Sequence, residues 1–124
     1  MTLSILAPAG AGLFYGMLGL AALIKPASLL SGFGLGAHSP DARNEVRAVY
    51  GGFPLAVAAL VLWSLSGAGH AEGILLALSL ASLGMALGRL VSAGIDRGIG
   101  RLPLVFVGVE LALAAMLAAG IDPA

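Results

Sequence analysis

The sequence predicts an all-α fold, a four-helix transmembrane bundle with short loops, and three observations lead to this prediction. The chain has 124 residues, of which 60% are hydrophobic and 10% charged, and its mean hydropathy is +1.06. A soluble domain of this length cannot bury so much apolar surface, because small folds leave a large share of the chain exposed. The apolar residues also form four runs, each close to the ~20 residues that a helix needs to cross ~30 Å of hydrocarbon.

The expected spans form a single membrane domain of residues 1–124 and cover residues 3–24, 46–65, 74–93 and 103–121. The runs are continuously apolar, whereas membrane β-barrels need alternating polar and apolar residues. No basic residue precedes the first run, so we expect a retained helix and not a cleaved signal peptide.

Two helix signals lie between the first and second spans. The segment that begins at Pro26 is expected to form a short interfacial helix, which is ended by the glycines that follow. Ser39, Pro40 and Asp41 provide a capping hydroxyl, a proline for the first helical position and an acid for the first turn. We therefore expect the second helix to begin near Pro40 and to protrude from the membrane.

Basic residues lie toward one side of these spans. Connections 25–45 and 94–102 carry or adjoin all six of them: Lys25, Arg43, Arg47, Arg89, Arg97 and Arg101. The opposite side has only His70, Glu72, Asp122 and the termini. Because basic residues in short loops stay in the cytoplasm, we expect a multi-pass membrane protein with both termini outside the cytoplasm.

Three ionisable residues fall within or at the edge of the spans, namely Arg47, Arg89 and Glu110. A charge at mid-membrane costs ~2.5–3.5 kcal/mol on insertion scales, so such residues usually face the protein interior. Glu110 is expected on the order of 10 Å from the start of its helix, a depth comparable with that of the two arginines. The three could therefore meet in the cytoplasmic half of the bundle, and we expect Glu110 within salt-bridge reach, ~4 Å or less, of Arg89 or Arg47.

Helical spacing extends this cluster. The third span has one polar stripe at steps of three and four residues: Ser82, Met85, Arg89, Ser92 and Asp96. In the second span Pro54 cannot donate to the carbonyl of Tyr50 and is expected to kink the helix. If the cluster binds a ligand, a cavity bordered by Tyr50, Pro54, Arg89 and Glu110 is expected. The candidate ligand-binding residues are Arg47, Tyr50, Arg89, Asp96 and Glu110.

Two glycine patterns are typical of close helix packing, Gly12-x-x-x-Gly16 in the first span and Gly84-x-x-x-Gly88 in the third. We expect both to pack within the bundle.

The sequence contains no pattern that is typical of a metal, cofactor, catalytic or nucleic-acid-binding site. The chain has no cysteine and no net charge, and no histidine or carboxylate pair has metal-ligand spacing. We predict no metal, no cofactor, no catalytic residue and no nucleic-acid partner.

Three sequence elements together carry a family resemblance. They are the run Asp41-Ala-Arg-Asn-Glu-Val-Arg-Ala-Val-Tyr-Gly-Gly52, the run Leu87-Gly-Arg-Leu-Val-Ser92 with Asp96 following, and Glu110 in the last span. They resemble the bacterial membrane proteins grouped as domain of unknown function 4345, over nearly the whole chain. The resemblance implies a short four-helix protein of a bacterial inner membrane, with polar positions at Arg47, Tyr50, Gly51, Gly52, Arg89, Asp96 and Glu110. A more distant likeness to DoxX-like proteins implies work near quinones.

These observations leave three functions open. In the leading hypothesis the protein is not an enzyme, and it binds a lipid-like or amphipathic molecule or serves as an accessory subunit. The arginines would then hold an anionic or carbonyl-bearing head group, with Glu110 orienting one of them. The second hypothesis is a homodimeric proton-coupled transporter that uses Glu110. The third is a subunit of a quinone-linked membrane oxidoreductase. A purely structural ion pair also remains open, and so do homo-oligomers and larger membrane complexes as partners beside the bilayer.

Overall fold

A computed structural model describes residues 2–67 and 69–121, so Asp122 and both chain ends lie outside the described residues. These residues form only helices and their connections, which confirms the predicted fold class. In chain order the elements are α1 (Thr2–Ile24), α2 (Pro26–Leu29), the 3₁₀ helix η1 (Ser31–Phe33), α3 (Pro40–Val46), the π-helix η2 (Arg47–Gly52), α4 (Phe53–Leu65), α5 (Ala71–Ile95) and α6 (Arg101–Ala118).

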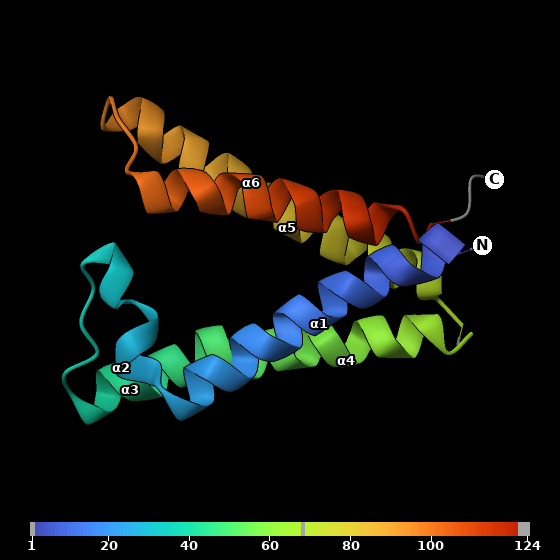
Figure 1. Ribbon diagram of the computed structural model, residues 1–124, viewed down its shortest axis with the longest axis horizontal. Helices are drawn as coiled ribbons and strands as arrows, with labels where there is room; N and C mark the ends of the chain where they lie inside the picture. The colour runs from blue at the N-terminus through green and yellow to red at the C-terminus, as the bar shows by residue number, and fades with distance from the viewer. Residues whose placement is uncertain (1, 68, 122–124) are drawn as a thin grey trace.

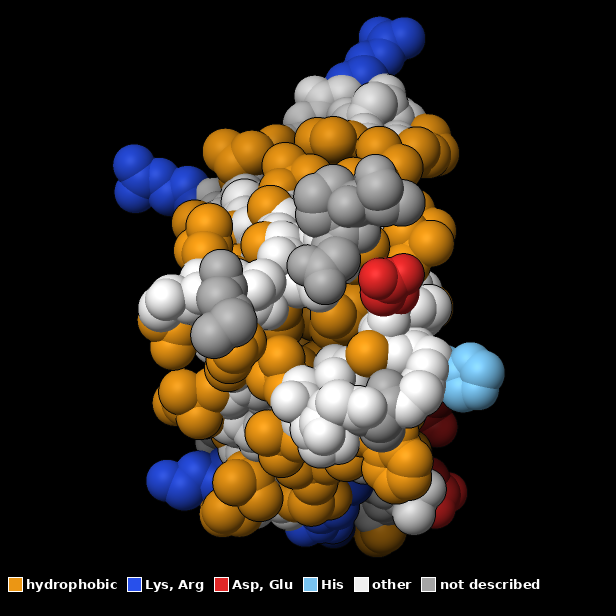
Figure 2. Space-filling view, turned by 90° about the vertical axis from the view of Figure 1, so that its right-hand side faces the viewer, with side chains coloured by type: hydrophobic (Ala, Val, Ile, Leu, Met, Phe, Trp, Pro, Cys, Tyr) orange, Lys and Arg blue, Asp and Glu red, His pale blue; other side chains and the backbone are white. Residues whose placement is uncertain are grey.

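Four helical stretches are long and apolar enough to cross a membrane: Thr2–Ile24, Pro40–Leu65, Ala71–Ile95 and Arg101–Ala118. Many large apolar side chains on these stretches point outward, among them Leu62, Val91 and Val105, each about three-fifths exposed. Hydrophobic side chains also dominate the view of the molecule along its long axis, with lysine and arginine toward the edges (Figure 2). The chain is therefore a multi-pass membrane protein.

The long helices form two pairs that diverge toward one end of the molecule (Figure 1). Helix α1 packs along α4 and η2, and α5 packs along α6. The pairs approach each other toward the end that holds the start of α1 and the close of α6. The buried core contains residues of all four long helices: Ala11, Tyr15, Val57, Val61, Leu75, Leu113 and Leu117.

Glycines let α1 approach its partner closely. A Cβ atom on Gly19 would lie 2.8 Å from the carbonyl oxygen of Gly51, and one on Gly12 would lie 3.1 Å from a methyl carbon of Val61. The first predicted glycine pattern therefore packs within the bundle. The prediction for Gly84 and Gly88 is wrong, because a Cβ at either position would meet no described atom within 4 Å. That face of α5 points away from the other helices.

The second membrane-crossing stretch begins as predicted. The Ser39 side chain accepts a hydrogen bond of 3.0 Å from the backbone N–H of Ala42, and Pro40 occupies the first turn. Pro54 is accommodated by a π-helical turn at Arg47–Gly52, in which the N–H of Phe53 bonds to the carbonyl of Ala48. Such widened turns shift the register of the side chains that follow them.

The connection between α1 and α3 reaches across to the other helix pair. The expected short helix after the first span is present as α2, and Gly34 ends η1 in the left-handed conformation with φ 71°. Phe33 of η1 packs against Phe106 of α6, with ring centroids 5.4 Å apart. This connection and the one between α5 and α6 lie at the end of the molecule where the helix pairs diverge (Figure 1).

Candidate functional site

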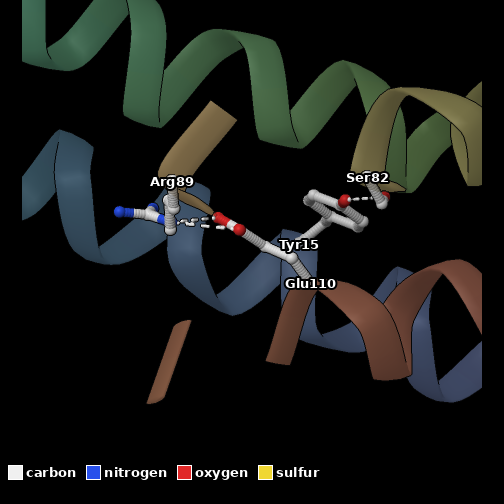
Figure 3. A network of polar contacts seen from close by, with 4 residues as sticks. All are labelled: Tyr15, Ser82, Arg89 and Glu110. Atoms are coloured by element: carbon white, nitrogen blue, oxygen red, sulfur yellow. Dashed lines mark hydrogen bonds and ion pairs between the residues drawn. The ribbon is translucent and has the colours of Figure 1, made fainter. Parts of the chain in front are cut away.

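Arg89 of α5 and Glu110 of α6 face each other between the two helix pairs (Figure 3). The Nε atom of Arg89 donates to both carboxylate oxygens, at 2.9 Å from Oε1 and 3.0 Å from Oε2. The side chain of Glu110 is 3% exposed and that of Arg89 is 28% exposed. A buried carboxylate needs such a partner, because burying an isolated charge is costly.

The guanidinium of Arg89 is also held by two aromatic rings. Its central carbon lies 5.3 Å from the ring centroid of Phe106 and 5.9 Å from that of Phe33, within the range of cation–π attraction. Both contacts to Glu110 use Nε, and no described residue accepts a hydrogen bond from the two terminal amino groups. Arg89 is therefore fixed in place while its terminal donors stay available.

A cavity of about 430 Å³ lies beside this ion pair, between the diverging helix pairs. Its wall is mainly apolar, and its polar members are Tyr15, Tyr50, Arg89 and Glu110. The full set of lining residues is Phe14, Tyr15, Leu18, Leu29, Leu30, Phe33, Leu35, Val49, Tyr50, Phe53, Pro54, Met85, Arg89, Phe106, Val109, Glu110 and Leu113. An apolar cavity of this size with a few convergent polar groups is typical of small-molecule sites.

Two hydrogen bonds between helices lie deeper in the bundle than the ion pair. The hydroxyl of Tyr15 lies 2.6 Å from Oγ of Ser82, which itself donates to the carbonyl of Leu78. Tyr15 is therefore the donor to Ser82, and this bond joins α1 to α5 (Figure 3). Ser79 donates across to the carbonyl of Ala114 on α6 at 2.8 Å. The Tyr15–Ser82 bond therefore joins the two helix pairs, and the Ser79–Ala114 bond joins the two helices of one pair.

The predicted candidate residues separate into two groups. Tyr50, Arg89 and Glu110 all border the cavity, together with Pro54. Glu110 lies within salt-bridge reach of Arg89, one of its two predicted partners, whereas Arg47 does not join the cluster. Its Nε donates instead to the carbonyl of Leu23 at the end of α1, at 3.1 Å. The π-helical turn explains this, because Arg47 and Tyr50 no longer have the spacing of an α-helical face.

Asp96 lies outside the cavity, in a second hollow of about 290 Å³ at the connection between α5 and α6. Its carboxylate accepts a hydrogen bond from Ser92 at 3.4 Å. Arg89 borders this hollow as well as the main cavity. Arg89 is therefore placed between the apolar cavity and the surface at the helix connection.

Sequence reasoning missed the aromatic contacts of Arg89. Phe106 lies four residues before Glu110 on α6, a spacing that places both side chains on one helix face, so this neighbour could have been found. Phe33 carries no such signal, because its position depends on the path of the connection after α2. Ser82 belongs to the predicted polar stripe of the third span, but its contact with Tyr15 was not predicted.

The fold and the site define a class: a small four-helix membrane protein with a buried carboxylate–arginine pair beside an apolar cavity. The chain belongs to the family described as Domain of unknown function (DUF4345), whose model matches residues 5–120. No curated protein and no solved structure gives a significant match to this chain. Among the described residues, no group of three or more histidine and carboxylate side chains is placed to hold a metal ion.

Proposed function

We propose that this protein binds a lipid-like or amphipathic small molecule in the cavity between its helix pairs, with the polar end of the molecule at Arg89. The observation that carries the proposal is the juxtaposition of a cavity of about 430 Å³ with an arginine whose terminal amino groups have no partner among the described residues. Donors of this kind, fixed in an apolar wall, orient a ligand that carries hydrogen-bond acceptors.

The geometry favours binding over proton exchange at Glu110. Both oxygens of this carboxylate accept from Arg89 Nε, and the Glu110 side chain is only 3% exposed, so the carboxylate is already engaged and has little access to solvent. A purely structural ion pair would leave no reason for the cavity, since side chains normally fill protein interiors to high density. The hypothesis of an accessory subunit is compatible with this proposal, because the cavity of the subunit would then hold a ligand of the larger complex.

We further propose that the ion pair lies in the cytoplasmic half of an inner membrane. The connections at residues 25–39 and 96–100 lie at one end of the bundle, and they carry or adjoin most of the basic residues. The positive-inside rule places that end in the cytoplasm. A ligand would then reach the cavity from the inner leaflet or from the cytoplasmic surface.

A matched pair of variants on α6 tests ligand binding. Val109 lines the cavity, whereas Val105 on the same helix is 60% exposed and does not line it. Val109→Trp should fill part of the cavity, and Val105→Trp adds the same side chain to the outer surface. Binding of two single-chain probes, neutral monoolein and anionic oleyl sulfate, is measured by native mass spectrometry and by radioligand displacement in nanodiscs.

We expect saturable binding of at least one probe to the native protein and to Val105→Trp. Val109→Trp should weaken that binding at least about tenfold, which corresponds to 1.4 kcal/mol. Equal binding by both variants, or no saturable binding of either probe, would overturn the proposed function. Unfolding temperatures of the two variants show whether Val109→Trp is folded under the assay conditions.

A further inference from the structure

The charge balance of the cavity points to the class of ligand. Among the described residues that line it, the charged ones are Arg89 and Glu110. They are in direct contact at 2.9 Å, so the cavity has no net formal charge. We infer that the cavity accepts an electrically neutral, chain-bearing molecule whose polar end is a carbonyl or ester acceptor, and that it disfavours anionic lipids. This inference rests on the proposed function.

An anionic head group would be poorly compensated at this site. If it bound next to Arg89, the head group and Glu110 would be two anions that share one cation. Glu110 is 3% exposed, so solvent screens this repulsion little, and charges interact strongly where the effective dielectric constant is low. A net charge buried in an apolar cavity is costly unless it is paired.

A cationic head group is also poorly matched. The two oxygens of Glu110 already accept from Arg89, and the two aromatic rings near the pair, Phe33 and Phe106, already face the guanidinium. An incoming cation would meet the positive charge of Arg89 with no free carboxylate beside it. The carboxylate and the two rings beside it are thus already engaged with Arg89.

A neutral acceptor fits the groups that remain. The terminal amino groups of Arg89 have no acceptor among the described residues, and neither has the hydroxyl of Tyr50, another residue of the cavity wall. A carbonyl or ester oxygen can accept from such donors and brings no net charge with it. Hydrogen bonds from a charged donor are also stronger than those between neutral groups. The apolar remainder of the wall suits a hydrocarbon chain.

The test compares three ligands with the same chain and different head groups. Tritiated monoolein is displaced from the native protein in nanodiscs by unlabelled monoolein, by oleyl sulfate and by oleyltrimethylammonium. We expect monoolein to compete at least about tenfold more strongly than either ion. In Glu110→Gln the guanidinium of Arg89 loses its counter-charge, so we expect the relative affinity for oleyl sulfate to rise. In the double variant Arg89→Gln/Glu110→Gln the preference among head groups should largely disappear.

The outcomes separate this inference from the proposed function. If oleyl sulfate binds the native protein as well as monoolein or better, and Val109→Trp weakens both, the cavity binds lipids but the inference of a neutral ligand is overturned. The native comparison decides this even if the Glu110→Gln variant fails to fold. If Val109→Trp affects no ligand, or none shows saturable binding, the proposed function itself fails.

Discussion

Arg89 holds Glu110 by a single nitrogen, Nε, which lies 2.9 Å and 3.0 Å from the two carboxylate oxygens. The partners are unequally buried, with 3% of the Glu110 side chain exposed against 28% of the Arg89 side chain. Removal of Arg89 therefore strands a charge that has almost no access to solvent. Removal of Glu110 strands a cation on a long side chain, which can reach a polar region more easily.

The first prediction is that Arg89→Leu destabilises the protein more than Glu110→Leu. Loss of one partner of a buried pair costs about 3–5 kcal/mol, and we expect Arg89→Leu to approach this range. The double variant Arg89→Leu/Glu110→Leu should be more stable than Arg89→Leu alone, because no charge is stranded. Reversible unfolding in mixed micelles, followed by circular dichroism, measures these free energies. Strictly additive effects of the two changes would contradict a direct pair.

The second prediction concerns the contact of Tyr15 with Ser82, whose oxygens lie 2.6 Å apart. Tyr15→Phe removes the donor and leaves Ser82 bonded to Leu78. Hydrogen bonds between membrane helices average about 0.6 kcal/mol, so the expected loss of unfolding free energy is of that order. Ser92→Ala, at an exposed hydroxyl of α5, is the control. A double-mutant cycle with Ser82→Ala that shows no coupling would exclude this hydrogen bond.

The third prediction uses glycines in opposite environments. A Cβ atom at Gly19 would lie 2.7 Å from Leu55 and 2.8 Å from the Gly51 carbonyl oxygen, whereas one at Gly84 would meet nothing within 4 Å. Gly19→Ala should destabilise the bundle by about 1–3 kcal/mol, the usual cost of overpacking. Gly84→Ala should be neutral or stabilise α5 by about 0.5–1 kcal/mol, because alanine is the better helix former. Similar losses at both positions would contradict the packing of α1 on η2 and α4.

The fourth prediction concerns orientation in the membrane. The chain has no cysteine, so single cysteines can be introduced at Gly69 and Gly98, where an added side chain would meet no described atom within 4 Å. An impermeant maleimide should label Gly69→Cys in intact cells and Gly98→Cys only after permeabilisation. The reverse labelling pattern would show that the basic end of the bundle faces away from the cytoplasm.

The helices could be predicted from sequence because their signals are local. The run from Thr2 to Ile24 contains no charged residue, and Ser39 caps the second stretch through a bond that its sequence context predicts. The proximity of Arg89 and Glu110 could be predicted from the sequence for a related reason. Depth along a membrane helix can be counted in residues, and two buried charges of opposite sign at similar depths attract each other.

Other features depend on geometry that local patterns do not contain. The position of Arg47 could not be inferred from its depth in the membrane, because the direction of its side chain depends on the π-helical turn at Arg47–Gly52. The outward face of Gly84 depends on how α5 is rotated against its neighbours, which glycine spacing does not determine. Phe33 reaches Arg89 through the path of a non-helical connection, and this path depends on tertiary contacts.

An experimental structure with a heavy-atom probe can show whether the cavity beside Arg89 holds the chain of an amphipathic ligand, as we propose. Crystals are grown with a monoacylglycerol that carries bromine atoms at mid-chain, and anomalous scattering locates the bromines. We expect bromine peaks between Leu18 and Val109, which both line the cavity, with the ester group near the terminal amino groups of Arg89. Bromine peaks confined to the outer apolar surface, for example beside Leu62 or Val91, with side chains closing the space beside Glu110, would contradict it.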